Sequence, residues 1–124
     1  MFRLLIVDDS NIIRRKVERS VLGEHFKVIG MAANGIEAIA KLKKKQHPDV
    51  ITMDLTMPGM DGIECIGKIM EINSSIRILV ISALADVETG ILALEKGARG
   101  FLRKPFSEQQ LVEALTELME AARV

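Results

Sequence analysis

The chain has 124 residues, 48% of them hydrophobic and 27% charged, and its 17 Lys and Arg residues balance its 17 Asp and Glu residues. This composition is that of an ordinary globular domain, which excludes a disordered or collagen-like chain, and the zero net charge does not favour a nucleic-acid or membrane-surface binder. A single cysteine, Cys65, and the lack of any apolar run of ~20 residues exclude an internal disulfide bond and a membrane span, so we expect one cytoplasmic domain over residues 1–124.

Five short apolar runs at fairly even spacing predict β-strands. They occupy residues 4–7, 28–31, 50–53, 78–81 and 101–102. Most of these runs are apolar at successive rather than alternate positions, which is typical of parallel strands buried on both faces.

The segments between and after these runs have apolar residues at helical spacing, which predicts five helices. The stripes are Ile12, Ile13, Val17 and Val21; Ile36, Ile39 and Ala40; Ile63, Ile66, Ile69 and Met70; Val87, Ile91 and Leu94; and Leu111, Leu115, Leu118 and Met119. Asp61 and Asp86 are suited to cap the third and fourth helices, and Ser107 with Gln110 forms a capping box at the fifth.

This alternation of strands and helices predicts a doubly wound α/β fold, (βα)5, with helices on both faces of a parallel five-stranded sheet. Because five strands are too few for an eight-stranded barrel, an open doubly wound sheet remains. Among the orders of such sheets we choose the flavodoxin-like order 2-1-3-4-5. In that order the ligand crevice lies at the carboxyl ends of the first and third strands.

Polar residues follow the predicted strands at this edge of the sheet. Asp8 and Asp9 follow the first strand, Asp54 the third, Ser82 the fourth and Lys104 the fifth. Two like charges ~4 Å apart repel by roughly 4 kcal/mol at an effective dielectric constant of ~20, so three gathered carboxylates should bind a cation or shift a pKa. An all-oxygen acidic site favours Mg²⁺ or Mn²⁺.

A divalent metal, a carboxylate, a hydroxyl and an ammonium group are the components of phosphoryl transfer. The metal and the lysine offset charge on the phosphoryl oxygens, while a carboxylate oxygen attacks in line and becomes an acyl phosphate. Each component alone also has a structural explanation, because Asp-Asp after a strand commonly begins a helix-entry turn and Lys-Pro a surface turn. Their combination at one edge of the sheet favours a site.

The chain resembles the receiver domain of two-component response regulators from end to end, and in style it is most similar to their stand-alone chemotaxis members. The matching strings are Leu-Ile-Val-Asp-Asp-Ser at 5–10, Asp-Leu-Thr-Met-Pro-Gly-Met-Asp-Gly at 54–62, Ile-Ser-Ala at 81–83, Gly-Ala at 97–98 and Lys-Pro-Phe at 104–106. The combination is highly specific, although no single string is.

The resemblance implies that Asp54 accepts a phosphoryl group from the phosphohistidine of a sensor histidine kinase. It implies Mg²⁺ held by Asp9, Asp54 and the backbone carbonyl of Thr56, with Asp8 acting through water. Thr56 and Leu84 would flank the path of the hydrolytic water and set the lifetime of the phosphorylated form. Because Leu84 is apolar and cannot orient that water, we expect slow self-dephosphorylation.

The resemblance also assigns Ser82 and Lys104 as phosphoryl contacts and implies a cis peptide bond before Pro105. It implies that Ser82 moves inward on phosphorylation and that Phe101 rotates into the vacated space, at a position where tyrosine is frequent. The surface that reports the change would comprise the fourth helix, the fifth strand and the fifth helix.

These implications describe a phosphorylation-dependent switch rather than a turnover enzyme, with a histidine kinase and a downstream protein as partners and with no nucleic-acid or membrane partner. We expect a monomer whose output is protein–protein contact, since an effector domain would need a longer chain. The receiver part of a longer transcriptional regulator is an alternative.

Two other functional classes use related folds. Haloacid-dehalogenase-type phosphatases also form an aspartyl phosphate, but on an Asp-x-Asp sequence after the first strand, whereas Asp8 and Asp9 are adjacent here. A flavodoxin-like FMN carrier would need a phosphate-binding loop after the first strand and an aromatic stack, and the chain has no Trp or Tyr.

Overall fold

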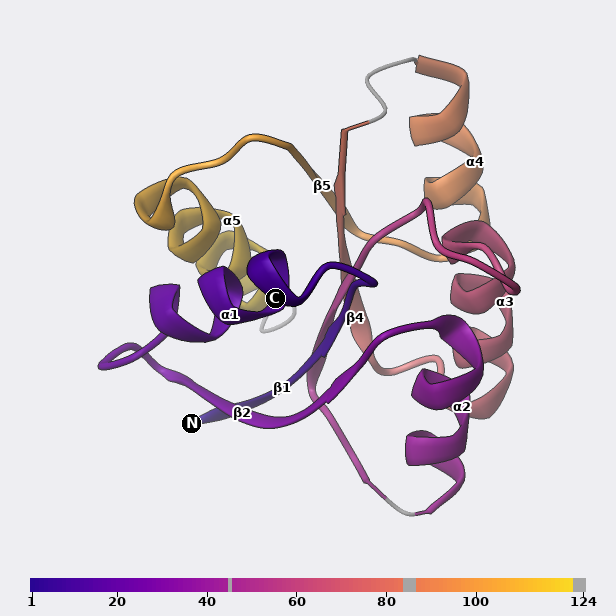
Figure 1. Ribbon diagram of the computed structural model, residues 1–124, viewed down its shortest axis with the longest axis horizontal. Helices are drawn as coiled ribbons and strands as arrows, with labels where there is room; N and C mark the ends of the chain where they lie inside the picture. Colours follow the sequence, from indigo (N-terminus) through magenta and orange to yellow (C-terminus); the bar gives the residue numbers. More distant parts are fainter. Residues whose placement is uncertain (45, 84–86, 122–124) are drawn as a thin grey trace.

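The computed structural model describes residues 1–44, 46–83 and 87–121. Strands and helices alternate along the chain, as the sequence predicts: β1 (Phe2–Val7), α1 (Asn11–Ser20), β2 (Phe26–Ala32), α2 (Gly35–Lys43), β3 (Val50–Met53), α3 (Gly62–Ile72), β4 (Arg77–Ser82), α4 (Val87–Lys96), β5 (Gly100–Arg103) and α5 (Glu108–Ala121). All neighbouring strands are parallel, and their order is β2-β1-β3-β4-β5 (Figure 1). The predicted doubly wound fold and its strand order are therefore confirmed.

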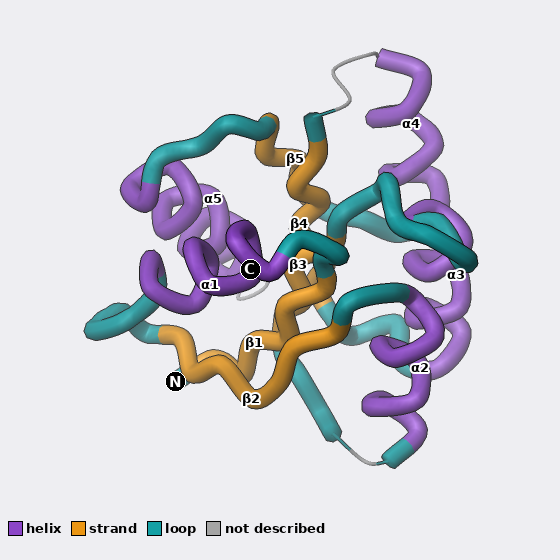
Figure 2. The backbone as a smooth tube through the Cα atoms, in the orientation of Figure 1, coloured by secondary structure: helices purple, strands orange, loops and turns teal. Residues whose placement is uncertain are grey.

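The helices form two layers, with α1 and α5 on one face of the sheet and α2, α3 and α4 on the other (Figure 2). Successive residues of β1 alternate between these layers: Leu5 and Val7 pack in the core under α2 and α3, and Leu4 and Ile6 pack in the core under α1 and α5. Because both faces are covered, every one of these side chains is buried, which explains the unbroken apolar runs in the sequence.

Helix α4 differs from the other helices because most of its large apolar residues are exposed. Val87, Ile91 and Leu94, the predicted stripe, are 75%, 49% and 55% exposed, and Ala93 is the buried residue of the helix. The stripe therefore does not face the core, because the small Ala93 side chain makes the contact with the layer beneath.

The helix ends follow local sequence signals. Asp61 accepts a hydrogen bond from the Glu64 N–H at the start of α3, and Ser107 and Gln110 exchange side-chain bonds as a capping box before α5. The predicted cap at Asp86 lies outside the described residues. None of the helices in the described parts of the chain has the length and apolarity to cross a bilayer.

The start of α3 lies directly against the chain that leaves β3. The Gly62 N–H donates to the Leu55 carbonyl at 3.0 Å. A Cβ atom at Gly62 would lie 2.3 Å from the Asp54 carbonyl oxygen and 2.6 Å from the Leu55 Cα, so only glycine permits this approach. This contact fixes the β3–α3 loop, which carries Asp54 and Thr56.

Candidate metal and phosphoryl site

The sheet register brings the acidic residues together. β1 and β3 are adjacent, with Val7 opposite Met53, so the next residues, Asp8 and Asp54, emerge side by side at the carboxyl edge. The Asp54 N–H donates to the Val7 carbonyl at 3.0 Å, which continues the ladder by one residue. On the other side of β3, the Lys104 N–H donates to the Ser82 carbonyl at 2.9 Å, which joins the ends of β4 and β5.

Three carboxylates form the acidic cluster of this edge, namely Asp8, Asp9 and Asp54. One oxygen from each lies within 4.8 Å of the other two. Asp8 and Asp54 are 3% and 4% exposed, whereas Asp9 is exposed. The cluster thus has a buried floor and an open side through which water could complete the coordination of a hard divalent cation.

Lys104 closes the cluster from the β5 side. Its ammonium donates to Asp8 Oδ2 at 3.0 Å and lies 3.4 Å from Asp54 Oδ1, and its side chain is only 18% exposed. Burial lowers the pKa of Lys104, but the hydrogen bond and charge of Asp8, together with the charge of Asp54, raise it above its usual value. The ammonium therefore stays charged within reach of both carboxylates.

Asp54 carries the most perturbed carboxyl of the site. Burial, reinforced by the charge of Asp8, raises the pKa of Asp54 from 3.8 to about 6, against the opposing effects of Lys104 and the Thr56 N–H. At Asp54, burial and the charge of Asp8 together outweigh the favourable charge of Lys104. A divalent cation would supply the missing positive charge, so the donor set fits a Mg²⁺-type ion.

Asp8 and Thr56 take up different positions around this cluster. Asp8 Oδ1 accepts the Ser10 N–H at 2.9 Å and Asp8 Oδ2 accepts Lys104, so both oxygens have a partner from the protein. The indirect role expected for Asp8 stays a prediction. The Thr56 N–H donates to Asp54 Oδ1 at 3.4 Å and its side chain is exposed, while the role of its carbonyl as a metal ligand stays a prediction.

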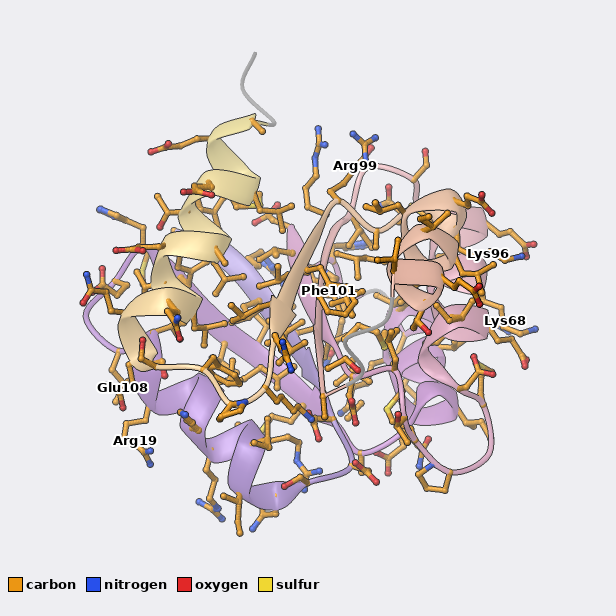
Figure 3. All side chains as sticks on the ribbon, turned by 90° about the horizontal axis from the view of Figure 1, so that it is seen from above. Arg19, Lys68, Lys96, Arg99, Phe101 and Glu108 are labelled. Carbon is orange, nitrogen blue, oxygen red and sulfur yellow. The ribbon has the colours of Figure 1, made fainter. Side chains whose placement is uncertain are left out.

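The residues of the expected switch lie on β4 and β5. Ser82 is fully buried at the end of β4, beside the β5 end that carries Lys104. Phe101 is 38% exposed and lies on the α4 side of β5 (Figure 3), so in this structure it is outside the core. The Lys104–Pro105 peptide bond is cis. Leu84 lies outside the described residues.

Two basic residues of α1 reach the site loops, which the sequence analysis did not predict. Arg14 Nη1 donates to the Asp8 carbonyl at 2.6 Å, and Lys16 Nζ donates to the Phe106 carbonyl. The many charged residues of this helix are typical of a helix face exposed to solvent. No local sequence signal marks Lys16 as different from the other charged residues of the helix, because its partner Phe106 lies 90 residues away.

Comparison with known proteins gives a consistent result. Residues 4–116 match the model of the response regulator receiver domain family. The chain is 38% identical to the chemotaxis protein CheY of Listeria monocytogenes over 115 residues, which cover 93% of this chain and 96% of that protein. It is 40% identical to the CheY of Thermotoga maritima over 116 residues, which cover 94% and 96%.

Solved structures share the same architecture. A chain of the CheX–CheY–BeF3–Mg²⁺ complex from Borrelia burgdorferi is similar with a TM-score of 0.89 and 35% identity, covering 95% of this chain and 89% of that one. The response regulator domain of Thermotoga maritima CheB is similar with a TM-score of 0.85 and 34% identity, covering 100% and 98%.

Proposed function

The chain belongs to the response regulator receiver domain family, and we propose that it is a phosphorylation switch in which Asp54 accepts a phosphoryl group from a histidine kinase. The observation that carries the proposal is the position of Asp54, a buried carboxylate of the acidic cluster that also lies 3.4 Å from the ammonium of Lys104. A carboxylate in this setting has a cation-binding side and a phosphoryl-binding side.

Asp9, Asp54 and the carbonyl of Thr56 would hold Mg²⁺, or Mn²⁺ where that ion is available. The bound ion would neutralise charge on the transferring phosphoryl oxygens and on the carboxylates. Asp8 would act on it through water, since its own oxygens are engaged by Ser10 and Lys104.

The transfer itself is an in-line displacement on phosphorus. An oxygen of Asp54 forms the new P–O bond while the P–N bond of the phosphohistidine breaks, and the departing imidazole takes a proton from water. Lys104 would move from the carboxylates to the phosphoryl oxygens, and the Ser82 hydroxyl would donate to another of them. The protein serves as acceptor and partial catalyst, so we do not expect turnover of a free substrate.

The output would be a protein contact on α4, β5 and α5. Three observations support it: the exposed apolar residues of α4, the exposed Phe101 on β5, and the similarity to CheY proteins. The neighbour from Borrelia burgdorferi is a complex of CheY with a second protein, CheX. We propose a chemotaxis-type pathway in the cytoplasm, with the chain acting as a monomer.

Incubation with acetyl phosphate, with and without Mg²⁺, tests this function by intact mass. We expect the gain of one phosphoryl group in Mg²⁺ and none in EDTA, and we expect hydroxylamine to remove it. The matched control is Asp54→Asn, which should gain nothing. A gain that survives in Asp54→Asn, or no gain at all in the wild type, would refute the proposal.

Turnover of an aryl phosphate separates the switch from a phosphatase. The phosphatase arrangement places its nucleophile after the first strand, whereas Asp54 follows β3. We therefore expect no sustained release of the aryl alcohol beyond one equivalent of protein, and multiple turnovers would favour the phosphatase.

A further inference from the structure

Helix α1 contacts both halves of the site through long basic side chains. Arg14 holds the carbonyl of Asp8, in the loop of the acidic cluster. Two residues later, Lys16 holds the carbonyl of Phe106, in the loop that carries Lys104. Both basic side chains are half-buried between helix and loop rather than extended into solvent. One rigid helix thus spans the two loops whose separation sets the Asp8–Lys104 ion pair.

Lys16 contacts Phe106 in two ways. Its ammonium donates to the Phe106 carbonyl and also lies 4.4 Å from the centroid of the Phe106 ring. The ring is only 3% exposed and packs in the core under α1 and α5. Core packing holds the ring of Phe106, and the Lys16 ammonium holds its backbone carbonyl, so both the side chain and the backbone of this residue are restrained.

Phe106 is separated from Lys104 by Pro105 alone, so the position of its backbone determines where the Lys104 side chain starts. Lys104 must place its ammonium 3.0 Å from Asp8 and 3.4 Å from Asp54 while being mostly buried. A small displacement of the Phe106 carbonyl would therefore move the ammonium away from the oxygens that it must contact.

We propose that Lys16 is a positioning residue, which holds the ammonium of Lys104 in place through the backbone and ring of Phe106. The inference rests on the proposed function, because the aim of Lys104 matters for phosphoryl transfer. Arg14 has the corresponding place on the acidic loop, so loss of Lys16 should affect the phosphoryl side of the site and leave the metal side intact.

The test measures two quantities in Lys16→Met, which keeps the length of the side chain and removes its charge. The first is the rate of phosphorylation by acetyl phosphate at saturating Mg²⁺, for which we expect a loss of roughly 10-fold. The second is the Mg²⁺ dissociation constant by calorimetry, which should stay within about twofold of the wild type. Lys16→Arg, which retains a donor for the carbonyl, should recover part of the rate.

Arg19→Met is the matched control on the same helix. Arg19 forms an exposed ion pair with Glu108 at 3.2 Å between α1 and α5 (Figure 3), and within the described parts of the chain this is the polar side-chain contact given for it. We expect this variant to phosphorylate at the wild-type rate. If Lys16→Met does not fold, Lys16→Gln, which is polar but uncharged, takes its place.

A double-mutant cycle distinguishes positioning from a general loss of stability. In a Lys104→Met background, Lys16→Met should cause no further loss of rate, because the group that it aims is gone. Equal losses in both backgrounds would overturn the inference, as would a Lys16→Met rate equal to that of Arg19→Met. Failure of the proposed function is a separate outcome, since the wild type itself would then gain no phosphoryl group.

Discussion

Two buried polar side chains, Asp54 and Thr52, have lost favourable contacts with water on folding. Asp54 is the main case, since burial and the charge of Asp8 raise its pKa to about 6. Thr52, two residues earlier on β3, is 2% exposed, and its hydroxyl oxygen has no hydrogen-bond partner among the described residues. We expect both side chains to lower the free energy of unfolding. Asp54 belongs to the candidate metal and phosphoryl site, whereas no functional role is assigned to Thr52.

Replacing Asp54 by Asn should stabilise the metal-free protein at neutral pH. Between pH 3.8 and about 6 the folded state retains a proton that the unfolded state has lost, so stability falls as pH rises through this window. Above pH ~6 we expect Asp54→Asn to exceed the wild type by on the order of 1–3 kcal/mol, and near pH ~4 the gain should disappear.

Urea unfolding in EDTA at both pH values measures this difference. An Asn variant that is less stable than the wild type at pH ~7.5, or a gain that is independent of pH, would contradict the assignment of the raised pKa to Asp54. Added Mg²⁺ should stabilise the wild type and leave the variant largely unchanged.

Thr52→Val should raise the free energy of unfolding by about 1 kcal/mol. The two side chains have nearly the same shape, and the substitution removes a buried hydroxyl that has lost its hydrogen bonds to water. Urea denaturation at neutral pH measures the effect. A decrease in stability would mean that the hydroxyl has a partner, such as a buried water molecule.

At the scale of elements, the start of α3 is the contact that fixes the acceptor loop. Gly62→Ala would place a Cβ atom against the backbone of Asp54 and Leu55, and backbone atoms cannot rotate away. We expect a loss of roughly 2–4 kcal/mol in stability and slower phosphorylation, because relief of the clash must displace the loop.

Gly67→Ala is the matched control within the same helix. A Cβ atom at Gly67 would meet only the Lys96 side chain, at an ordinary 3.7 Å. Because alanine favours helix over glycine, this variant should gain up to about 1 kcal/mol and phosphorylate normally. The argument for Gly62 fails if the two variants have the same stability and rate.

At the scale of the whole molecule, the sheet order and the gathering of Asp8, Asp54 and Lys104 were predictable from sequence. Apolar runs at successive positions require strands covered on both faces, and parallel strands bring their carboxyl ends to one edge. The polar residues that follow those runs then lie at that edge, and the long side chain of Lys104 reaches Asp8 and Asp54 from β5.

The exposure of the α4 apolar residues and the contact of Lys16 with Phe106 depend on tertiary packing, and the sequence pattern does not predict them. The α4 stripe of Val87 and Ile91 has core-like spacing, yet it faces solvent because Ala93 makes the buried contact. Lys16 lies in a stretch of charged residues that is typical of a solvated helix face. Its partner Phe106 comes from a part of the chain 90 residues later. Such contacts join residues remote in sequence, so local periodicity does not predict them.

The central claim is that Asp54, which lies close to both Asp9 and Lys104, is the residue that becomes phosphorylated. Borohydride reduction after acetyl phosphate treatment tests it most directly, since it converts an aspartyl phosphate to homoserine and so marks the position. Peptide mass spectrometry should find homoserine at position 54, in Mg²⁺ and not in EDTA. Homoserine at Asp8 or Asp9 instead, or a phosphoryl group on any other side chain, would contradict the account.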